Sequence, residues 1–342
     1  MDRFAEYDDI SRYRQTLMGI ALFSVMFSHW FGFQEITTGI PYLVSTILTK
    51  LVFTGGLLFL SGFGLYYSFS KDHGVRGFYK RRLTRLYIPF LLLSLPLYTY
   101  FLCCRDDYGL LDYAGQLSTL FFWFKGNYGG MWYVAISLFL YLVFPAIYLF
   151  VFKTHSGGRV VAKACIMLIT LYLALVGIRT FFPSYFEVVE IGIEKIPFFI
   201  LGMLLAYEVR ETVLTRKEYR YGVLVIGVLY AGLTALNRFM DSYWLNHFTG
   251  IFQKLFFIPL LCILFNLLGN GFVGRTVKSF FDWFGKYSLE LYILHLHFYM
   301  FFHFGFLNTS LSDCAQATMA MCFALALCVP VNRLLAMVTK RR

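Results

Sequence analysis

Apolar stretches of about twenty residues recur along the whole chain, and short polar segments separate them. An α-helix needs roughly 20 predominantly apolar residues to cross the hydrocarbon core of a bilayer. The pattern therefore predicts an all-α, polytopic transmembrane helical bundle with about ten spans. The expected spans are 15–33, 43–67, 84–104, 131–152, 161–181, 191–208, 220–237, 249–269, 286–306 and 314–338.

The composition excludes a water-soluble protein. Hydrophobic residues make up 59% of the 342 positions, charged residues 14%, and the mean hydropathy is +0.65, whereas soluble domains carry about 25% charged residues. We expect one membrane-embedded domain, 1–342, in the cell membrane. The chain begins without a signal peptide's basic start and cleavage site, so we expect its first span to be retained. Seven scattered cysteines without C-x-x-C spacing argue against a disulfide framework or a zinc site.

The basic residues predict the orientation of the spans. With the N-terminus in the cytoplasm, ten spans place 23 of the 30 Lys and Arg residues on the cytoplasmic side. This asymmetry obeys the positive-inside rule and predicts that both termini are cytoplasmic. The net charge of +11 then reflects topology and contact with anionic membrane lipid. Its division among short loops argues against nucleic-acid binding.

His29, Glu290 and His295 are ionisable side chains inside apolar spans, where burial is costly, and each is a functional candidate. His29 lies in a stretch of 20 residues, Gln15–Gln34, that contains no charged side chain. It follows the cytoplasmic start of its helix by about fourteen residues, which places it roughly 21 Å deep and nearer the outer face. Glu290 and His295 lie in the ninth span. The alternative for each is a hydrogen bond to a neighbouring helix that only stabilises packing.

A dense basic segment, Lys80–Arg85, precedes the third span. Arg82 and Arg85 are spaced i,i+3, so on an α-helix their guanidinium groups share one face and can bind phosphate. The alternative is a basic loop that only fixes topology and contacts lipid. In the second span, Ser61 lies among glycines that let helices approach closely, and packing alone can explain these glycines.

Five short motifs extend, in order, over nearly the whole chain. They are Gly19-Ile-Ala with His29 closing the first helix, Leu60-Ser61-Gly-Phe63, Arg82-x-x-Arg85 before Leu-Tyr-Ile-Pro89, Trp132-Tyr133 leading to Tyr141-Leu-Val-Phe-Pro145, and Gly285-Lys-Tyr-Ser288-Leu-Glu290-Leu-Tyr292-Ile-Leu-His295. In this order and spacing, the chain resembles the acyltransferase type 3 family of integral membrane acyltransferases.

The resemblance implies an enzyme that moves an acetyl or similar group from acyl-CoA to a hydroxyl, commonly on a sugar of a surface polysaccharide. It implies His29 as the catalytic residue and Arg82 and Arg85 as ligands of the donor phosphates. Acyl-CoA is then a co-substrate with no permanently bound cofactor, and the acceptor is a carbohydrate or lipid-linked carbohydrate of the cell envelope. Further residues are candidates for supporting roles: Arg14, Ser61, Trp132, Tyr141, Ser288, Glu290 and His295.

The chain departs from the family pattern at two positions. Met18 replaces the arginine that often precedes the first-helix histidine by eleven residues, and Ser137 replaces an acidic residue in the Trp132–Pro145 motif. Arg14 lies one helical turn before Met18 on the same face and is a candidate substitute. These departures leave open how His29 is oriented.

The residues alone allow two roles for His29. An imidazole can remove the proton of an attacking alcohol near neutral pH, or it can carry the acyl group covalently. Tyr292, Ser288 and Asn127 are candidates for stabilising the oxyanion. The rival interpretation is a proton-coupled secondary transporter with a relay of intramembrane His and Glu, although the sequence lacks the matching broken helices of inverted halves. A scaffold protein would not need His29.

Overall fold

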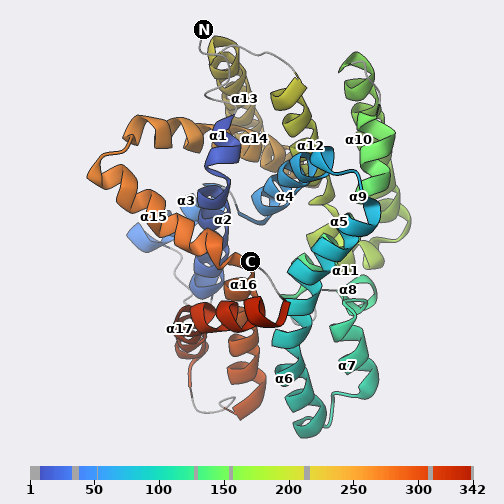
Figure 1. Ribbon diagram of the computed structural model, residues 1–342, viewed down its shortest axis with the longest axis vertical. Helices are drawn as coiled ribbons and strands as arrows, with labels where there is room; N and C mark the ends of the chain where they lie inside the picture. The colour runs from blue at the N-terminus through green and yellow to red at the C-terminus, as the bar shows by residue number, and fades with distance from the viewer. Residues whose placement is uncertain are drawn as a thin grey trace. The chain divides into compact units, whose positions relative to one another are not determined.

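The computed structural model describes residues 8–32, 38–51, 53–126, 130–153, 157–211, 216–306 and 311–339 (Figure 1). Their regular secondary structure is helical, as predicted, and includes no strand. The helices are α1 (Asp8–Arg12), α2 (Arg14–Gly32), α3 (Gly39–Leu51), α4 (Phe53–Lys71), α5 (Val75–Arg82), α6 (Ile88–Cys104), α7 (Leu110–Leu117), α8 (Phe121–Lys125), α9 (Trp132–Phe152), α10 (Gly157–Phe181), α11 (Pro183–Ile193), α12 (Ile196–Glu211), α13 (Arg216–Leu236), α14 (Tyr243–Leu268), α15 (Phe272–Lys286), α16 (Ser288–Phe301) and α17 (Asp313–Thr339).

Six helices in the described part of the chain are long and apolar enough to cross a membrane. Each coincides with a predicted span. Of the other four predicted spans, 15–33 coincides with α2, 43–67 is divided between α3 and α4, 191–208 falls mainly on α12, and 286–306 falls on α16 and the π-helical turn Phe302–Phe306. Of these, α12 and α16 have only 16 and 14 residues, so neither reaches the length of a full crossing by itself. The count of ten therefore stays a prediction. The six are Val75–Cys104, Trp132–Phe152, Gly157–Phe181, Glu218–Leu236, Tyr243–Leu268 and Asp313–Thr339.

Two of these helices present nearly all of their apolar surface outward. Only 11% of the apolar segment of α10 is buried inside the protein, and the same fraction holds for Glu218–Leu236 of α13. Leu173 and Val228, for example, are 67% and 65% exposed. Continuous apolar surface of this kind is unfavourable in water and is typical of contact with lipid.

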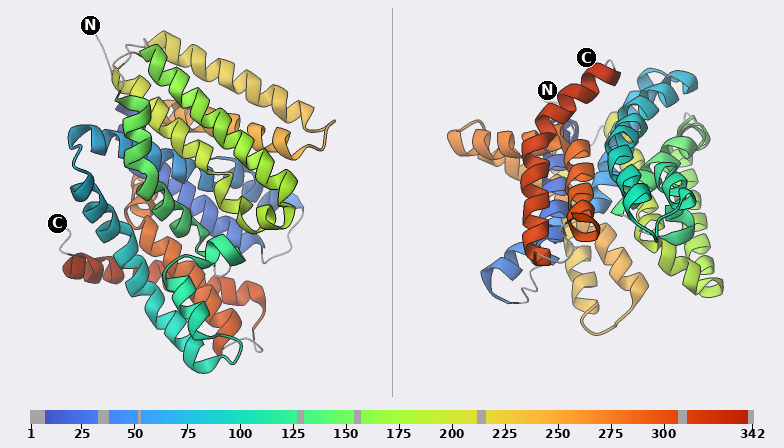
Figure 2. Two further views of the ribbon diagram at one scale, coloured as in Figure 1. Left: turned by 90° about the vertical axis from the view of Figure 1, so that its right-hand side faces the viewer. Right: turned by 90° about the horizontal axis from the view of Figure 1, so that it is seen from below.

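Contacts divide the chain into two compact units. One is formed by Met1–Ser28, Ile36–Tyr67 and Phe198–Ser288, and the other by His29–Glu35, Ser68–Pro197 and Leu289–Arg342. Each unit is assembled from three separate stretches, so helices distant in sequence pack together within it. In the first unit, α13 and α14 form a helical hairpin (Figure 2) in which Tyr230 packs on Phe256 and Phe257.

Glycines bring the backbones of α4 and α12 into direct contact. A methyl carbon built on Gly62 would lie 2.1 Å from the carbonyl oxygen of Phe199, and one on Gly202 would lie 2.0 Å from that of Phe59. These distances are far below van der Waals contact, so only glycine fits at either position. The contacts support the packing explanation of the glycines in the second span.

The helix α15 packs on α2 by a similar close approach. A methyl carbon on Gly19 would lie 1.8 Å from the carbonyl oxygen of Phe281, and one on Gly285 would lie 2.0 Å from that of Gln15. The hydroxyl of Thr16 donates a hydrogen bond to Asp282 Oδ1 over 2.5 Å. The helix that carries His29 is thereby fixed near its beginning.

In the second unit, α5 and α6 form one continuous helix, Val75–Cys104, through a π-helical turn at Leu83–Tyr87. The backbone N–H of Ile88 donates to the carbonyl of Leu83, five residues earlier. Pro89 explains the widening, because proline has no N–H and its ring clashes with the carbonyl four residues before it, that of Arg85. The helix begins nine residues before the predicted start of the third span.

Candidate active site

The structure brings two predicted site residues together although they are 266 positions apart. His29 lies in the last turn of α2 and His295 in the middle of α16. His29 Nδ1 and His295 Nε2 are 3.1 Å apart, and the rings stack with centroids separated by 5.3 Å. His295 Nδ1 lies 2.8 Å from the carbonyl oxygen of Leu291 on its own helix. His295 is 3% exposed, whereas His29 is only half-buried.

The histidine pair lines a cavity of about 640 Å³. Trp132 of the sequence motifs is also part of its wall, and much of the remaining lining is aromatic. The lining residues are His29, Trp30, Tyr98, Phe101, Arg105, Asp107, Tyr108, Gln116, Gly130, Trp132, Ile191, His295, Leu296, Tyr299, Met300, Phe304, Ala317, Ala320 and Met321. The volume falls in the range typical of sites for small molecules.

Hydrogen bonds between helices fix the walls of this cavity. Trp30 Nε1 donates to Thr318 Oγ1 over 2.9 Å, which joins the end of α2 to α17. The hydroxyl of Tyr292 donates to the carbonyl of Gly130 over 2.8 Å, which joins α16 to the start of α9. Tyr292, a candidate for stabilising the oxyanion, is thus engaged by backbone, and Asn127 lies outside the described residues.

A charged pair contributes to the wall of the cavity at the end of α6. Arg105 donates to both carboxylate oxygens of Asp107, over 2.9 and 2.6 Å. Its guanidinium group lies over the rings of Phe101 and Phe304, at 5.3 and 5.2 Å from their centroids. The hydrogen bonds from Arg105 lower the pKa of Asp107, so the carboxylate stays ionised and holds the guanidinium in place.

Sequence analysis missed several cavity residues and a buried polar cluster nearby. His297 Nε2 lies 3.4 Å from Ser94 Oγ, and the ring of His297 packs edge-on against Tyr98. Within the described residues, the Tyr98 hydroxyl and His297 Nδ1 are buried without a hydrogen-bond partner. Two features of the sequence point to these residues. His297 follows His295 by two positions, and Arg105 is one of few basic residues on the predicted outer side.

Glu290 has a contact that explains its burial. Asn332 Nδ2 of α17 donates to Glu290 Oε1 over 2.8 Å, and Glu290 is 2% exposed. It does not line the cavity. This bond joins α16 to α17. It fits the alternative raised for Glu290 from the sequence, a hydrogen bond to a neighbouring helix that stabilises packing.

Arg14, Ser61 and Ser288 also lie outside the cavity wall. Arg14 Nε donates to the carbonyl of Leu60 over 3.1 Å, and its side chain packs against Gly64. Ser61, the neighbour of Leu60, is half-buried on α4, and Ser288 begins α16 half-buried. The contact of Arg14 joins α2 to α4. Other groups must therefore orient His29.

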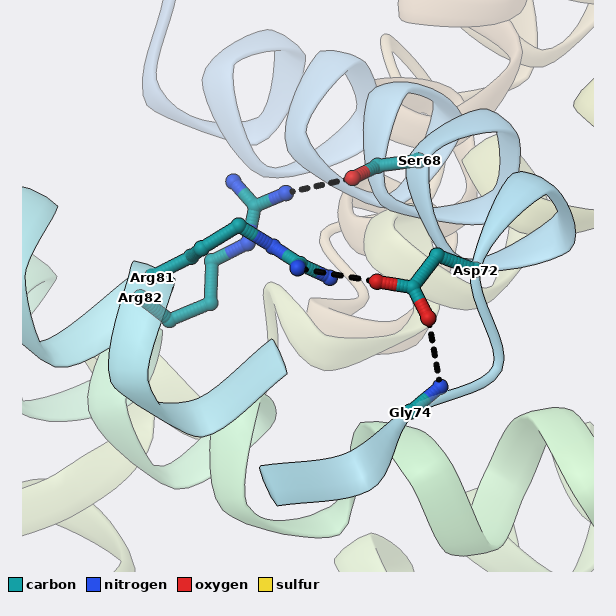
Figure 3. A network of polar contacts seen from close by, with 5 residues as sticks. All are labelled: Ser68, Asp72, Gly74, Arg81 and Arg82. Atoms are coloured by element: carbon teal, nitrogen blue, oxygen red, sulfur yellow. Dashed lines mark hydrogen bonds and ion pairs between the residues drawn. The ribbon is translucent and has the colours of Figure 1, made fainter. Parts of the chain in front are cut away.

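Of the predicted phosphate-binding arginines, Arg82 lies in the last turn of α5 (Figure 3) and Arg85 lies on the following π turn. Arg82 Nη2 donates to Ser68 Oγ over 3.1 Å, and its guanidinium group lies over the ring of Tyr141 at 5.9 Å. Arg82 is half-buried and Arg85, on the π turn, is exposed. The π turn changes the regular α-helical spacing assumed for this pair. Neither arginine lines the cavity.

The neighbouring Arg81 has a different partner. It donates to Asp72 Oδ2 over 2.9 Å, and Asp72 Oδ1 accepts the backbone N–H of Gly74 over 3.0 Å (Figure 3). The bond from Gly74, followed by that from Arg81, lowers the pKa of Asp72. Arg81 is therefore engaged in closing the turn between α4 and α5.

No group of three or more His, Cys, Asp and Glu side chains in the described ranges is arranged to hold a metal ion. The most distinctive group in the cavity wall is the imidazole pair of His29 and His295.

A family model described as an acyltransferase domain, that of acyltransferase type 3, matches residues 16–333. The chain belongs to this family of integral membrane acyltransferases. This finding confirms the resemblance, the location in the membrane and the assignment as a transferase, and it replaces the transporter interpretation. Comparison with curated proteins and with solved structures gave no match.

Proposed function

We propose that this acyltransferase moves an acetyl or similar acyl group from cytosolic acyl-CoA to a hydroxyl of a carbohydrate or lipid-linked carbohydrate of the cell envelope. His29 acts as the base that removes the acceptor's proton, or as an acyl carrier. The observation that carries the proposal is the position of His29, half-buried and facing a cavity large enough for a substrate. An imidazole is well suited to proton transfer near neutral pH.

The aromatic lining of the cavity supports a carbohydrate acceptor. Trp30, Trp132 and Tyr299 combine flat apolar faces with a polar edge. A sugar ring has apolar C–H faces and polar hydroxyl edges, so it matches such walls better than a purely apolar molecule does.

The predicted topology assigns the cavity to the outer side of the membrane. Under that topology, the lining residues lie in the outer half of their spans or in an outer loop, except His295 and Leu296, which lie at the middle of the ninth span. Arg82 and Arg85 lie at the cytoplasmic end of the Val75–Cys104 helix, and Tyr98 and Arg105 lie toward its outer end. From Arg85 to Tyr98 the helix rises roughly 20 Å. We propose that CoA phosphates bind at the arginines, while the acyl arm extends along this helix toward His29.

The first prediction concerns this topology. An epitope tag inserted between α4 and α5, at Asp72–Gly74, is expected to be reached by antibody only from the cytoplasmic side. A tag between α6 and α7, at Asp106–Tyr108, is expected to be reached only from outside, because one continuous helix separates the two insertion sites. Detection of both tags on one side, or of each on the opposite side, would contradict the predicted orientation.

The second prediction concerns the donor. The double substitution Arg82→Gln and Arg85→Gln is expected to raise the KM for acyl-CoA at least tenfold, because charge-assisted contacts to phosphate are lost. Folding should tolerate the change, since Arg85 is exposed and glutamine keeps a hydrogen-bond donor at the half-buried position 82. Initial rates at varied acyl-CoA and saturating acceptor measure this effect.

Arg81→Gln is the matched control for the double variant. Arg81 is adjacent in sequence and carries the same charge, but it pairs with Asp72 in an exposed salt bridge. Because Asp72 already engages its guanidinium group, its loss should leave the KM for acyl-CoA within about twofold of the wild-type value. An unchanged KM in the double variant would return the basic segment to a purely topological role.

A further inference from the structure

The contacts of the histidine pair define which nitrogen carries each hydrogen. A carbonyl oxygen can only accept, so the 2.8 Å contact to Leu291 places a hydrogen on His295 Nδ1. In the neutral ring, His295 Nε2 is then an acceptor. The 3.1 Å contact from His29 Nδ1 to His295 Nε2 therefore requires a hydrogen on His29 Nδ1, and His29 Nε2 is left with its lone pair.

The remaining nitrogen of His29 is accessible. His29 lines the cavity and is only half-buried. Within the described part of the chain, no hydrogen bond engages His29 Nε2. The lone pair is thus on the imidazole nitrogen of His29 that has no hydrogen bond to a described residue.

We propose that His295 is a positioning residue that holds His29 in the tautomer with hydrogen on Nδ1, so that Nε2 is the atom that performs proton transfer. The inference rests on the proposed function, because it assigns His29 the role of base. In this arrangement a backbone carbonyl and a neutral imidazole replace the carboxylate that orients the histidine of a serine-protease triad.

The proton balance of the reaction follows from this assignment. The lone pair of His29 Nε2 takes the proton of the acceptor hydroxyl while its oxygen bonds to the thioester carbonyl carbon. The C–S bond then breaks with its electron pair on sulfur, and the thiolate takes the proton from Nε2. The products are the ester and free CoA thiol, and His29 returns to its neutral tautomer. Throughout, Nδ1–H continues to donate to His295, which stabilises the transient imidazolium.

Nitrogen-15 NMR of the purified, histidine-labelled full-length protein tests the tautomer without substrates. At neutral pH, His29 is expected to show a protonated Nδ1 and an unprotonated Nε2, with its signals assigned by their absence in His29→Ala. In His295→Leu, a substitution of similar volume, hydrogen should redistribute toward Nε2. His297→Leu is the matched control, since it removes a buried imidazole of the same helix that contacts Ser94 and not His29, and it should leave the His29 signals unchanged.

Kinetics provide an independent readout. Loss of the correct tautomer should remove much of the 10²- to 10⁴-fold that a general base contributes, so kcat of His295→Leu is expected to fall roughly 100-fold with both KM values unchanged. His295→Gln should recover most of kcat, because its amide can accept from His29 and donate to Leu291.

Two results would overturn the inference. One is an NMR spectrum of the wild-type protein in which His29 carries its hydrogen on Nε2. This measurement does not depend on the folding of a variant at position 295. The other is an unchanged kcat and tautomer population in a folded His295→Leu protein. Transfer that persists in His29→Ala would instead remove the catalytic role of His29, while the NMR measurement would still decide its tautomer.

Discussion

Replacing His29 by alanine is expected to lower acyl transfer at least 100-fold while the amount of membrane-inserted protein stays near the wild-type level. The loss of rate follows from removal of the general base, which contributes about 10²- to 10⁴-fold. Stability should change modestly, because the substitution leaves a small space beside an existing cavity and also removes a partly desolvated polar group. Transfer of labelled acetyl from acetyl-CoA, normalised to protein in the membrane, measures the effect.

Sealed vesicles extend this test to the direction of transfer. With labelled acetyl-CoA on the cytoplasmic side and acceptor on the other, the wild-type protein should form product and His29→Ala should not. His73→Ala serves as the control, since His73 is an exposed histidine between α4 and α5 that does not line the cavity. Product that appears only when both substrates share the cytoplasmic side would rule out transfer across the membrane. Full activity of His29→Ala would rule out its catalytic role.

Gly62→Ala is expected to have a large effect on folding. Its new methyl group would lie 2.1 Å from the carbonyl oxygen of Phe199, and that oxygen belongs to the backbone of α12 and cannot rotate away. The helices must separate, and the overpacking should cost about 1–3 kcal/mol or more. We expect a melting temperature in detergent that is clearly lower than that of the wild type, with less protein recovered as a monodisperse species.

Gly232→Ala is the matched control for this substitution. Gly232 lies within α13, and a methyl group there meets nothing within 4 Å. Alanine is favoured over glycine inside a helix by about 1 kcal/mol, so this variant should melt at or above the wild-type temperature. If the two alanine variants melted alike, the close crossing of α4 and α12 would be refuted.

The apolar pattern located the helices because each span must satisfy its backbone hydrogen bonds internally, which only a helix can do within one segment. The same pattern identified His29 and His295 separately, as ionisable groups in apolar surroundings. Their pairing could not be predicted, since the contact joins positions 266 apart and depends on how α2 packs with α16. The amino-acid pattern of one helix carries no information about which distant helix covers it.

The cavity illustrates the same limit. Trp132 was found through a motif, but Tyr98, Tyr108 and Gln116 resemble any other residues near the end of a span. The π turn, by contrast, has a cause that is visible in the sequence. Pro89 follows Arg85 by four positions and disrupts the regular α-helical hydrogen bonding there. Spacing arguments for Arg82 and Arg85 assumed an unbroken α-helix, and the structure shows that Leu83–Tyr87 departs from it.

The π turn also makes chain length critical within an otherwise uniform helix. A π turn amounts to one residue inserted into an α-helix, and each residue of an α-helix turns the chain by about 100°. Deleting a single residue within Leu83–Tyr87 would leave a segment just as hydrophobic, yet it would close the π turn and bring the ring of Pro89 against the carbonyl four residues before it. An added residue would rotate everything before the turn and swing Arg82 away from Ser68. Substitutions that preserve hydropathy should therefore accumulate freely in this part of the family, whereas insertions and deletions should not.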